Sequence, residues 1–220
     1  MIGFKQNDGS LKIAGLAFKM EQGGADQTEL IKVLSRETPD EYIVPPVQTL
    51  GQYALAYLAN TKLLTFSEGT VIINPYACTN CLELNEVKLP QSLTEIGDRA
   101  FFRCSITALI IPSNVTSIGA LAFGSNAIAK IIIQSPTLTL DGGTRANYGC
   151  FYANPVEVYD FRSATSVYEL NRGGGLGYSD NGAKIVVPDN LYDTWKTTWE
   201  ALEDWETDQF TWIKASEYTE

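Results

Sequence analysis

Two cysteines at Cys-x-x-Cys spacing are the first residues of this 220-residue chain that could do chemistry. Cys78 and Cys81 have the spacing of a redox pair or of half a zinc site. The chain contains no histidine, which removes the commonest zinc ligand and the usual base of a nucleophilic pair. Cys81 and Cys104 occupy the same place in a repeated phrase described below. We therefore interpret these thiols as small buried hydrophobic groups, and leave open whether Cys81 and Cys104 are oxidised.

Two further segments have compositions that occur in ligand sites. Residues 173–177 are rich in glycine, but no Lys-Ser/Thr pair follows them as in a phosphate loop. Residues 203–208 are acidic, without the spacing of a calcium loop. None of the 26 Asp and Glu residues is set in the apolar context of a catalytic carboxylate pair. We expect a flexible loop, a solvated acidic surface, no metal, no cofactor and no enzymatic activity.

A phrase that recurs every 22 or 23 residues accounts for most of the remaining residues. Its clearest copy contains Leu89-Pro90, then Ile96-Gly97, then Ala100-Phe101. The first anchor falls at Pro45, Ser67, Pro90, Pro112 and Gln134. The second anchor falls at Gly51, Asn74, Gly97 and Gly119. A fixed period of this length is typical of a solenoid.

Each copy predicts the same local structure. Short β-branched runs, such as residues 109–111 and 131–133, predict one parallel strand per copy. The proline that follows a run cannot donate to a sheet, so it ends the strand. The Gly or Asn of the second anchor predicts a turn with positive φ. The Ala-Phe pair then places a small and a large side chain in the core.

The phrase resembles the leucine-rich repeats, and most closely the BspA-like subfamily, over residues 43–134. The resemblance implies a right-handed α/β repeat solenoid with one short parallel strand per repeat. Stacked repeats bury one continuous core and need caps at both ends.

We expect three segments along the chain. Asn7-Asp8-Gly9 predicts a turn of an N-terminal hairpin, and Asp26 with Glu29 predicts the start of a helix through Ile31. Leu191, Trp195 and Trp199 fall on one stripe of a predicted C-terminal helix. The segments are a hairpin and helix cap over residues 1–42, a solenoid over residues 43–187 (regular over 43–134, degenerate over 135–187), and a Trp-rich helical cap over residues 188–220.

Charge and hydropathy restrict the partners. A formal net charge of −10 and a sequence pI near 4.5 argue against nucleic acid and anionic membranes, which need a basic face. No apolar run approaches the roughly 18 residues of a membrane span. The first residues lack the basic-then-apolar order of a signal peptide.

Side-chain alternation along the predicted strands identifies a candidate binding column. The outward residues are predicted to be Val44, Thr65, Lys88, Ile110, Ile132 and Glu157. Ile110 and Ile132 would form an apolar patch beside Lys88, with Glu86 and Lys130 on its rim. Either a partner binds this patch, or a cap, an insertion or a neighbouring subunit covers it. Aromatic and basic residues of the degenerate part predict a second surface: Tyr148, Phe151, Tyr152, Tyr159, Tyr168 and Tyr178, with Arg145, Arg162 and Arg172.

These observations predict a non-catalytic recognition module that binds a protein or a glycan through a rigid face. The family resemblance implies a secreted or cell-surface protein. The alternative is a phage or prophage virion subunit that uses the same face for assembly, including assembly with copies of itself.

Overall fold

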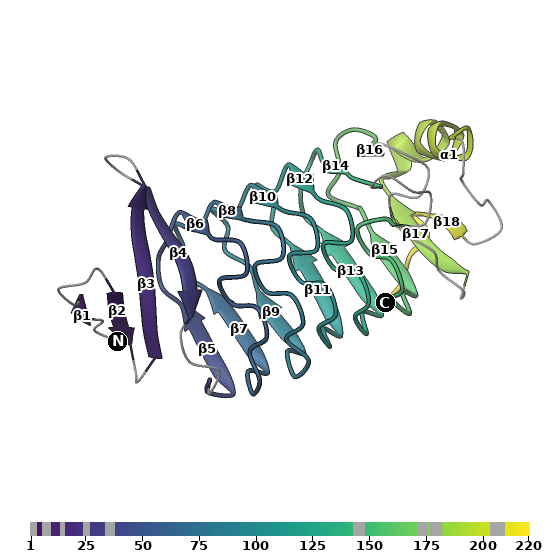
Figure 1. The fold of residues 1–220 in the computed structure, drawn as a ribbon. Coiled ribbons are helices and arrows are strands. Elements are labelled where there is room, and N and C mark those ends of the chain that lie inside the picture. Colours follow the sequence, from purple (N-terminus) through teal and green to yellow (C-terminus); the bar gives the residue numbers. More distant parts are fainter. Residues whose placement is uncertain are drawn as a thin grey trace.

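The chain winds into a stack of coils, six of which contribute one strand to each of two columns (Figure 1). The computed structural model describes residues 4–5, 10–13, 16–23, 27–33, 38–142, 148–170, 176, 182–202 and 210–220, with the backbone alone before residue 38. The solenoid of parallel strands expected from the repeated phrase is confirmed.

The longer strands form one column in which neighbours run parallel. It consists of β5 (Glu41–Val44), β7 (Leu63–Phe66), β9 (Glu86–Lys88), β11 (Ala108–Ile111), β13 (Lys130–Ile133), β15 (Val158–Asp160), β17 (Ala183–Val187) and β18 (Phe210–Lys214). We call the solvent side of this column the long-strand face. The column is divided, because β5-β7-β9 form one sheet and β11 to β18 form another.

A second column consists of short strands, one in each of six coils, that the repeated phrase does not predict. Its members are β6 (Thr49–Leu50), β8 (Ile72–Ile73), β10 (Glu95–Ile96), β12 (Ser117–Ile118), β14 (Thr139–Leu140) and β16 (Glu169–Leu170). They form one ten-stranded sheet with the N-terminal strands β1 (Phe4–Lys5), β2 (Ser10–Ile13), β3 (Leu16–Gly23) and β4 (Gln27–Val33).

The N-terminal helix prediction is wrong, because Gln27–Val33 forms strand β4. This strand pairs antiparallel with β3 and parallel with β6, so its backbone groups join the N-terminal strands to the first coil. Sheet pairing with two neighbours overrides the local capping signature. Strands β1 and β2 pair antiparallel on either side of residues 6–9, where the turn is predicted. The predicted turn itself lies outside the described residues.

Tight turns form a third side of the coils, and positive φ occurs there at unexpected positions. Within each of four successive coils two residues four apart have φ between 53° and 63°: Tyr53 and Tyr57, Tyr76 and Asn80, Arg99 and Arg103, Leu121 and Ser125. Each turn also bonds to the next coil; Phe101 N, for example, donates to Ala122 O over 2.7 Å. The prediction of positive φ at Gly97 and Gly119 is wrong. Glycine is needed there because coils touch: a Cβ on Gly97 would lie 2.6 Å from Pro75 N.

The core is a continuous stack of side chains inside the coils. Successive phenylalanine rings lie 5–6 Å apart, with centroid distances of 5.1 Å for Phe101–Phe123 and 6.0 Å for Phe123–Phe151. Leu50, Ile73 and Ile96 of the second column are buried to 1% exposure or less. Burying each such side chain stabilises the fold by about 1.5–3 kcal/mol.

Cys81 and Cys104 belong to a hydrogen-bonded ladder inside the stack. Each thiol donates to a carbonyl of the preceding coil, at 3.1 Å to Leu55 O and 3.3 Å to Cys78 O. Asn126 and Asn154 continue the same ladder. All four cysteines are buried and free of disulfides. Burial raises the pKa of Cys78 and Cys150, so these thiols stay protonated near neutral pH. Hydrogen bonds within the ladder, first of all the one with Cys104, lower the pKa of Cys81. The burial of Cys78 and the ladder position of Cys81 support the structural interpretation of the Cys-x-x-Cys pair.

Aromatic residues close the C-terminal end of the core. Helix α1 (Tyr192–Glu200) buries Trp195 and Trp199, on the stripe that the sequence predicts. Trp195 stacks on Phe161 at 5.7 Å, and Trp199 Nε1 donates to Tyr168 O over 3.1 Å. Strand β18 then pairs with β17, so this end combines a helix with a strand. The boundaries of the three segments stay predictions.

Candidate functional site

Strand pairing defines which residues share the outward column of the long-strand face. Ile43 lies opposite Thr65, and Thr65 opposite Lys88. After the division of the column, Ile110 lies opposite Ile132. Ile43 and Ile110 are 56% and 53% exposed, while Ile132 is half-buried. The outward column therefore has isoleucines on both sides of Thr65 and Lys88.

Two members of the predicted column are wrong. Val44 is fully buried. Side chains alternate along β5, so Ile43 takes the outward position opposite Thr65, and Val44, the next residue, faces the core. Glu157 precedes β15, and Asp160 takes the place opposite Ile132. The copy that ends in β15 is longer than the regular period, which shifts the outward position.

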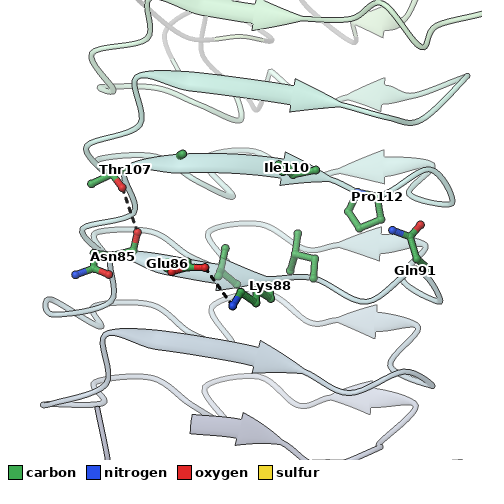
Figure 2. Close-up of a pocket in the computed structure, with 10 residues that line it drawn as sticks. Asn85, Glu86, Lys88, Gln91, Thr107, Ile110 and Pro112 are labelled. Carbon is green, nitrogen blue, oxygen red and sulfur yellow. Dashed lines mark hydrogen bonds and ion pairs between the residues drawn. The ribbon is translucent and has the colours of Figure 1, made fainter. Parts of the chain in front are cut away.

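A groove opens on this face where the column divides, between β9 and β11 (Figure 2). Its volume is about 510 Å³. It is lined by Asn85, Glu86, Val87, Lys88, Leu89, Gln91, Thr107, Ala108, Ile110 and Pro112. Three residues predicted for binding, Glu86, Lys88 and Ile110, therefore line one site.

A backbone bond that joins β11 to β13 has no equivalent at one end of the groove. Further along the column, Gln134 N donates to Ile111 O over 2.9 Å and holds β13 against β11. Pro112 occupies the equivalent place in the preceding coil and has no N–H to offer Leu89 O. Leu89 is half-buried where its equivalent Ile111 is fully buried, so the groove has an apolar lining.

One exposed ion pair borders the groove. Lys88 Nζ lies 3.4 Å from Glu86 Oε1, and both side chains are more than half exposed. Exposed pairs of this kind contribute at most about 1 kcal/mol to stability, so both charges can re-pair with a partner at little cost. Lys130, the other predicted rim residue, is engaged elsewhere: its Nζ lies 2.8 Å from Glu220 Oε1.

The second predicted surface, in the degenerate part, is wrong in its main members. Phe151, Tyr159 and Tyr168 are core residues, and burial raises the pKa of both tyrosines. Tyr148 and Tyr152 are half-buried and pack edge to face. Arg162 is bound to Asp160. The remaining predicted members, Arg145, Arg172 and Tyr178, lie outside the described residues.

The comparisons with known proteins agree with the coil geometry. A sequence model described as a BspA type leucine rich repeat region, in 6 copies, matches residues 48–169. The chain belongs to this family of BspA-type leucine-rich repeats. Families of leucine-rich repeats are typically non-catalytic, and the repeat is consistent with a protein-interaction module.

Two solved structures are similar to this BspA-type chain. The pneumococcal vaccine antigen PcpA is 12% identical, with a TM-score of 0.41 over 84% of this chain and 64% of that chain. A leucine-rich repeat protein from Bacteroides ovatus ATCC 8483 is 13% identical, with a TM-score of 0.47 over 79% and 64%. The chain thus spans less than two thirds of either protein. No curated protein sequence matches it.

The turns of the BspA-type coils carry an exposed aromatic cluster that the repeated phrase alone does not predict. Tyr53 and Tyr57 are 44% and 52% exposed. The Tyr53 ring stacks on Tyr76 at 5.2 Å, and Arg99 Nη1 donates to Tyr76 Oη over 3.2 Å. Positions 53, 76 and 99 are successive members of one repeat column, so the period itself contained the signal.

The described residues contain neither a metal-binding cluster nor a membrane-crossing helix. No group of three or more cysteine, aspartate or glutamate side chains among them could hold an ion. No described helix has the length and apolar character that a bilayer crossing requires.

Proposed function

We propose that this chain is a non-catalytic protein-interaction module that binds a partner protein on its long-strand face, across the groove between β9 and β11. The observation that carries the proposal is the exposure of Ile110 beside a groove of about 510 Å³. An apolar side chain of the partner would enter the groove and cover Ile110.

The rigidity of the face favours binding. Outward residues stand on strands whose opposite sides pack into the core, as the alternating burial of β11 and β13 shows. Ordering such a surface costs little conformational entropy on association. Burying an isoleucine at the centre of an interface adds about 1.5–3 kcal/mol.

The polar groups at the groove favour a protein partner. Glu86 and Lys88 offer one acceptor and one donor of opposite charge, next to the apolar groups of Leu89 and Ile110. Hydrophobic contacts surrounded by polar groups are the usual composition of a protein interface.

Site-specific photo-crosslinking tests the proposal. A photoreactive amino acid at position 110 should capture one protein partner in the native setting, whereas the same group at exposed position 95, on β10, should capture none. The captured partner should then bind the Ile110→Asp variant at least about 30-fold more weakly, as expected of an interface centre. Capture of the same partner from position 95 alone would contradict the proposed surface.

A further inference from the structure

The C-terminal segment lies across the far end of the long-strand face. It leaves β18, forms a short 3-10 helix (Ala215–Glu217), and reaches β13 and β15. Figure 1 places the C-terminus beside these two strands. We call residues 215–220 the strap.

Two basic side chains hold the strap through one ring and one carboxylate. Glu220 Oε1 lies 2.8 Å from Lys130 Nζ and 3.5 Å from Arg162 Nη2. The same two cations lie over the Tyr218 ring, at 5.8 Å for Lys130 Nζ and 5.4 Å for Arg162 Cζ. Lys130 and Arg162 together therefore contact an aromatic residue and the acidic residue two positions after it.

The site that receives the strap is built from strands of the solenoid. Asp160, which is 2% exposed, holds Arg162 through Nε–Oδ1 and Nη2–Oδ2 contacts of 2.9 and 2.6 Å. A bidentate contact to a buried carboxylate fixes the guanidinium in place. Lys130 stands on β13 in the outward set that includes Ile132. The Asp160–Arg162 contact and the place of Lys130 on β13 involve no residue of the strap.

The strap is weakly attached by comparison. Its 3-10 helix buries no residue, and the Glu220 side chain is 65% exposed. The remaining bonds join residues 215 and 216 to the exposed carboxylate of Asp189, including one from Ser216 N to Oδ1 at 3.0 Å. Segments held by few apolar contacts and by exposed bonds open at the low end of the stability range.

The strap lies where the outward column changes from exposed to buried. Ile110 is exposed and Ile132 half-buried, whereas Asp160 and Val186, next in the same column, are buried to 2% and 0% exposure. Displacing the strap would lengthen the free part of the face toward its C-terminal end.

We propose that Lys130 and Arg162 form a recognition site for a partner-protein segment that carries an aromatic residue and, two positions later, a carboxylate. The chain's own Tyr218-Thr219-Glu220 occupies this site as a displaceable strap. The regulatory consequence, a longer free face, rests on the proposed function of that face; the recognition site itself does not.

A peptide titration of the full chain tests the proposal. The probe is a synthetic peptide of residues 214–220, and the strap is opened by the double substitution Tyr218→Ser with Glu220→Gln. By NMR titration the opened variant should bind the peptide at least tenfold more tightly than the unaltered chain, whose strap competes at a high effective concentration. The peptide with the same two substitutions is the matched control and should not bind.

A substitution in the receiving site provides the second arm. Lys130→Gln in the opened variant should reduce peptide affinity at least fivefold, whereas Lys184→Gln, an exposed lysine of β17, should leave it unchanged. Equal binding to opened and unaltered chains, or no effect of Lys130→Gln, would overturn the proposal. If the double variant does not fold, Glu220→Gln alone serves as the opened form, with the same criteria. The photo-crosslinking result at position 110 is independent of these outcomes.

Discussion

Gly97 lies directly against Pro75 of the preceding coil, so a Cβ at position 97 would meet Pro75 N at 2.6 Å and Pro75 Cδ at 2.7 Å. Both nearest groups belong to the neighbouring coil, and one is main-chain, so neither can move without separating the coils. The second anchor of the repeat is thus a contact between coils.

Gly97→Ala is therefore expected to lower the free energy of unfolding by about 2–3 kcal/mol, the cost of forcing atoms into a packed core. Chemical denaturation of both chains measures the difference. Gly69→Asn is the control, because Gly69 has φ +99° and open space around it, so a residue that tolerates positive φ should cost less than about 1 kcal/mol. A Gly97→Ala variant as stable as the unaltered chain would show that the coils are not in contact here.

The ladder inside the coils predicts unequal costs for two substitutions in one column. Asn154 Nδ2 donates to Phe123 O and Phe151 O at 2.8 Å, and its Oδ1 accepts from Ile128 N at 3.1 Å. Asn154→Ala leaves these buried groups unpaired and should cost about 3 kcal/mol of unfolding free energy. Cys104→Ala removes a weak hydrogen bond donated by the thiol to Cys78 O, and should cost about 1–2 kcal/mol less than Asn154→Ala. Equal costs would mean that the amide bonds do not stabilise the stack.

The strap predicts a dependence on pH. The hydrogen bond from Lys130 lowers the pKa of Glu220 below its ordinary value of 4.5, and raises the pKa of Lys130 above 10.5. A lowered acid pKa stabilises the closed strap above the unfolded-state value, and this contribution is lost as pH falls through the lower folded-state pKa. The raised pKa of Lys130 acts in the alkaline range, where its stabilisation of the closed strap is lost as pH rises through the folded-state pKa.

Tyr218 ring signals in an NMR pH titration should therefore move toward those of an exposed tyrosine below about pH 4, with Glu220→Gln showing the exposed signals at neutral pH. Added salt should produce the same change at constant pH, because exposed charges are screened. Ring signals that are identical in the Glu220→Gln variant and the unaltered chain would show that the carboxylate does not hold the strap.

The solenoid could be predicted from the sequence because each coil repeats residues with strong local preferences, such as Ile96-Gly97 and Ala100-Phe101. The second column is not predictable from the sequence because its strands, such as Ser117–Ile118, have only two residues each. The local sequence does not predict strand β4 because its partner strands, and not its capping residues, determine its conformation.

The candidate site could be predicted only in part. Side-chain alternation identified Glu86, Lys88 and Ile110, since it needs no knowledge of neighbouring strands. The groove exists because β9 and β11 do not pair. The prolines do not predict this, because Pro90 stands at the same repeat position as Pro112 and β7 and β9 nevertheless pair. The strap joins Lys130 to Glu220, 90 residues away, and no local pattern contains that contact.

The Ile110→Asp variant, measured for both partner affinity and melting temperature, tests the proposed interaction surface most directly. Because Ile110 is 53% exposed and faces away from the core, we expect a loss of binding of about 30-fold or more with a melting temperature within about 2 °C of the unaltered chain. A large fall in melting temperature, or binding that does not change, would contradict the assignment of the long-strand face as the interaction surface.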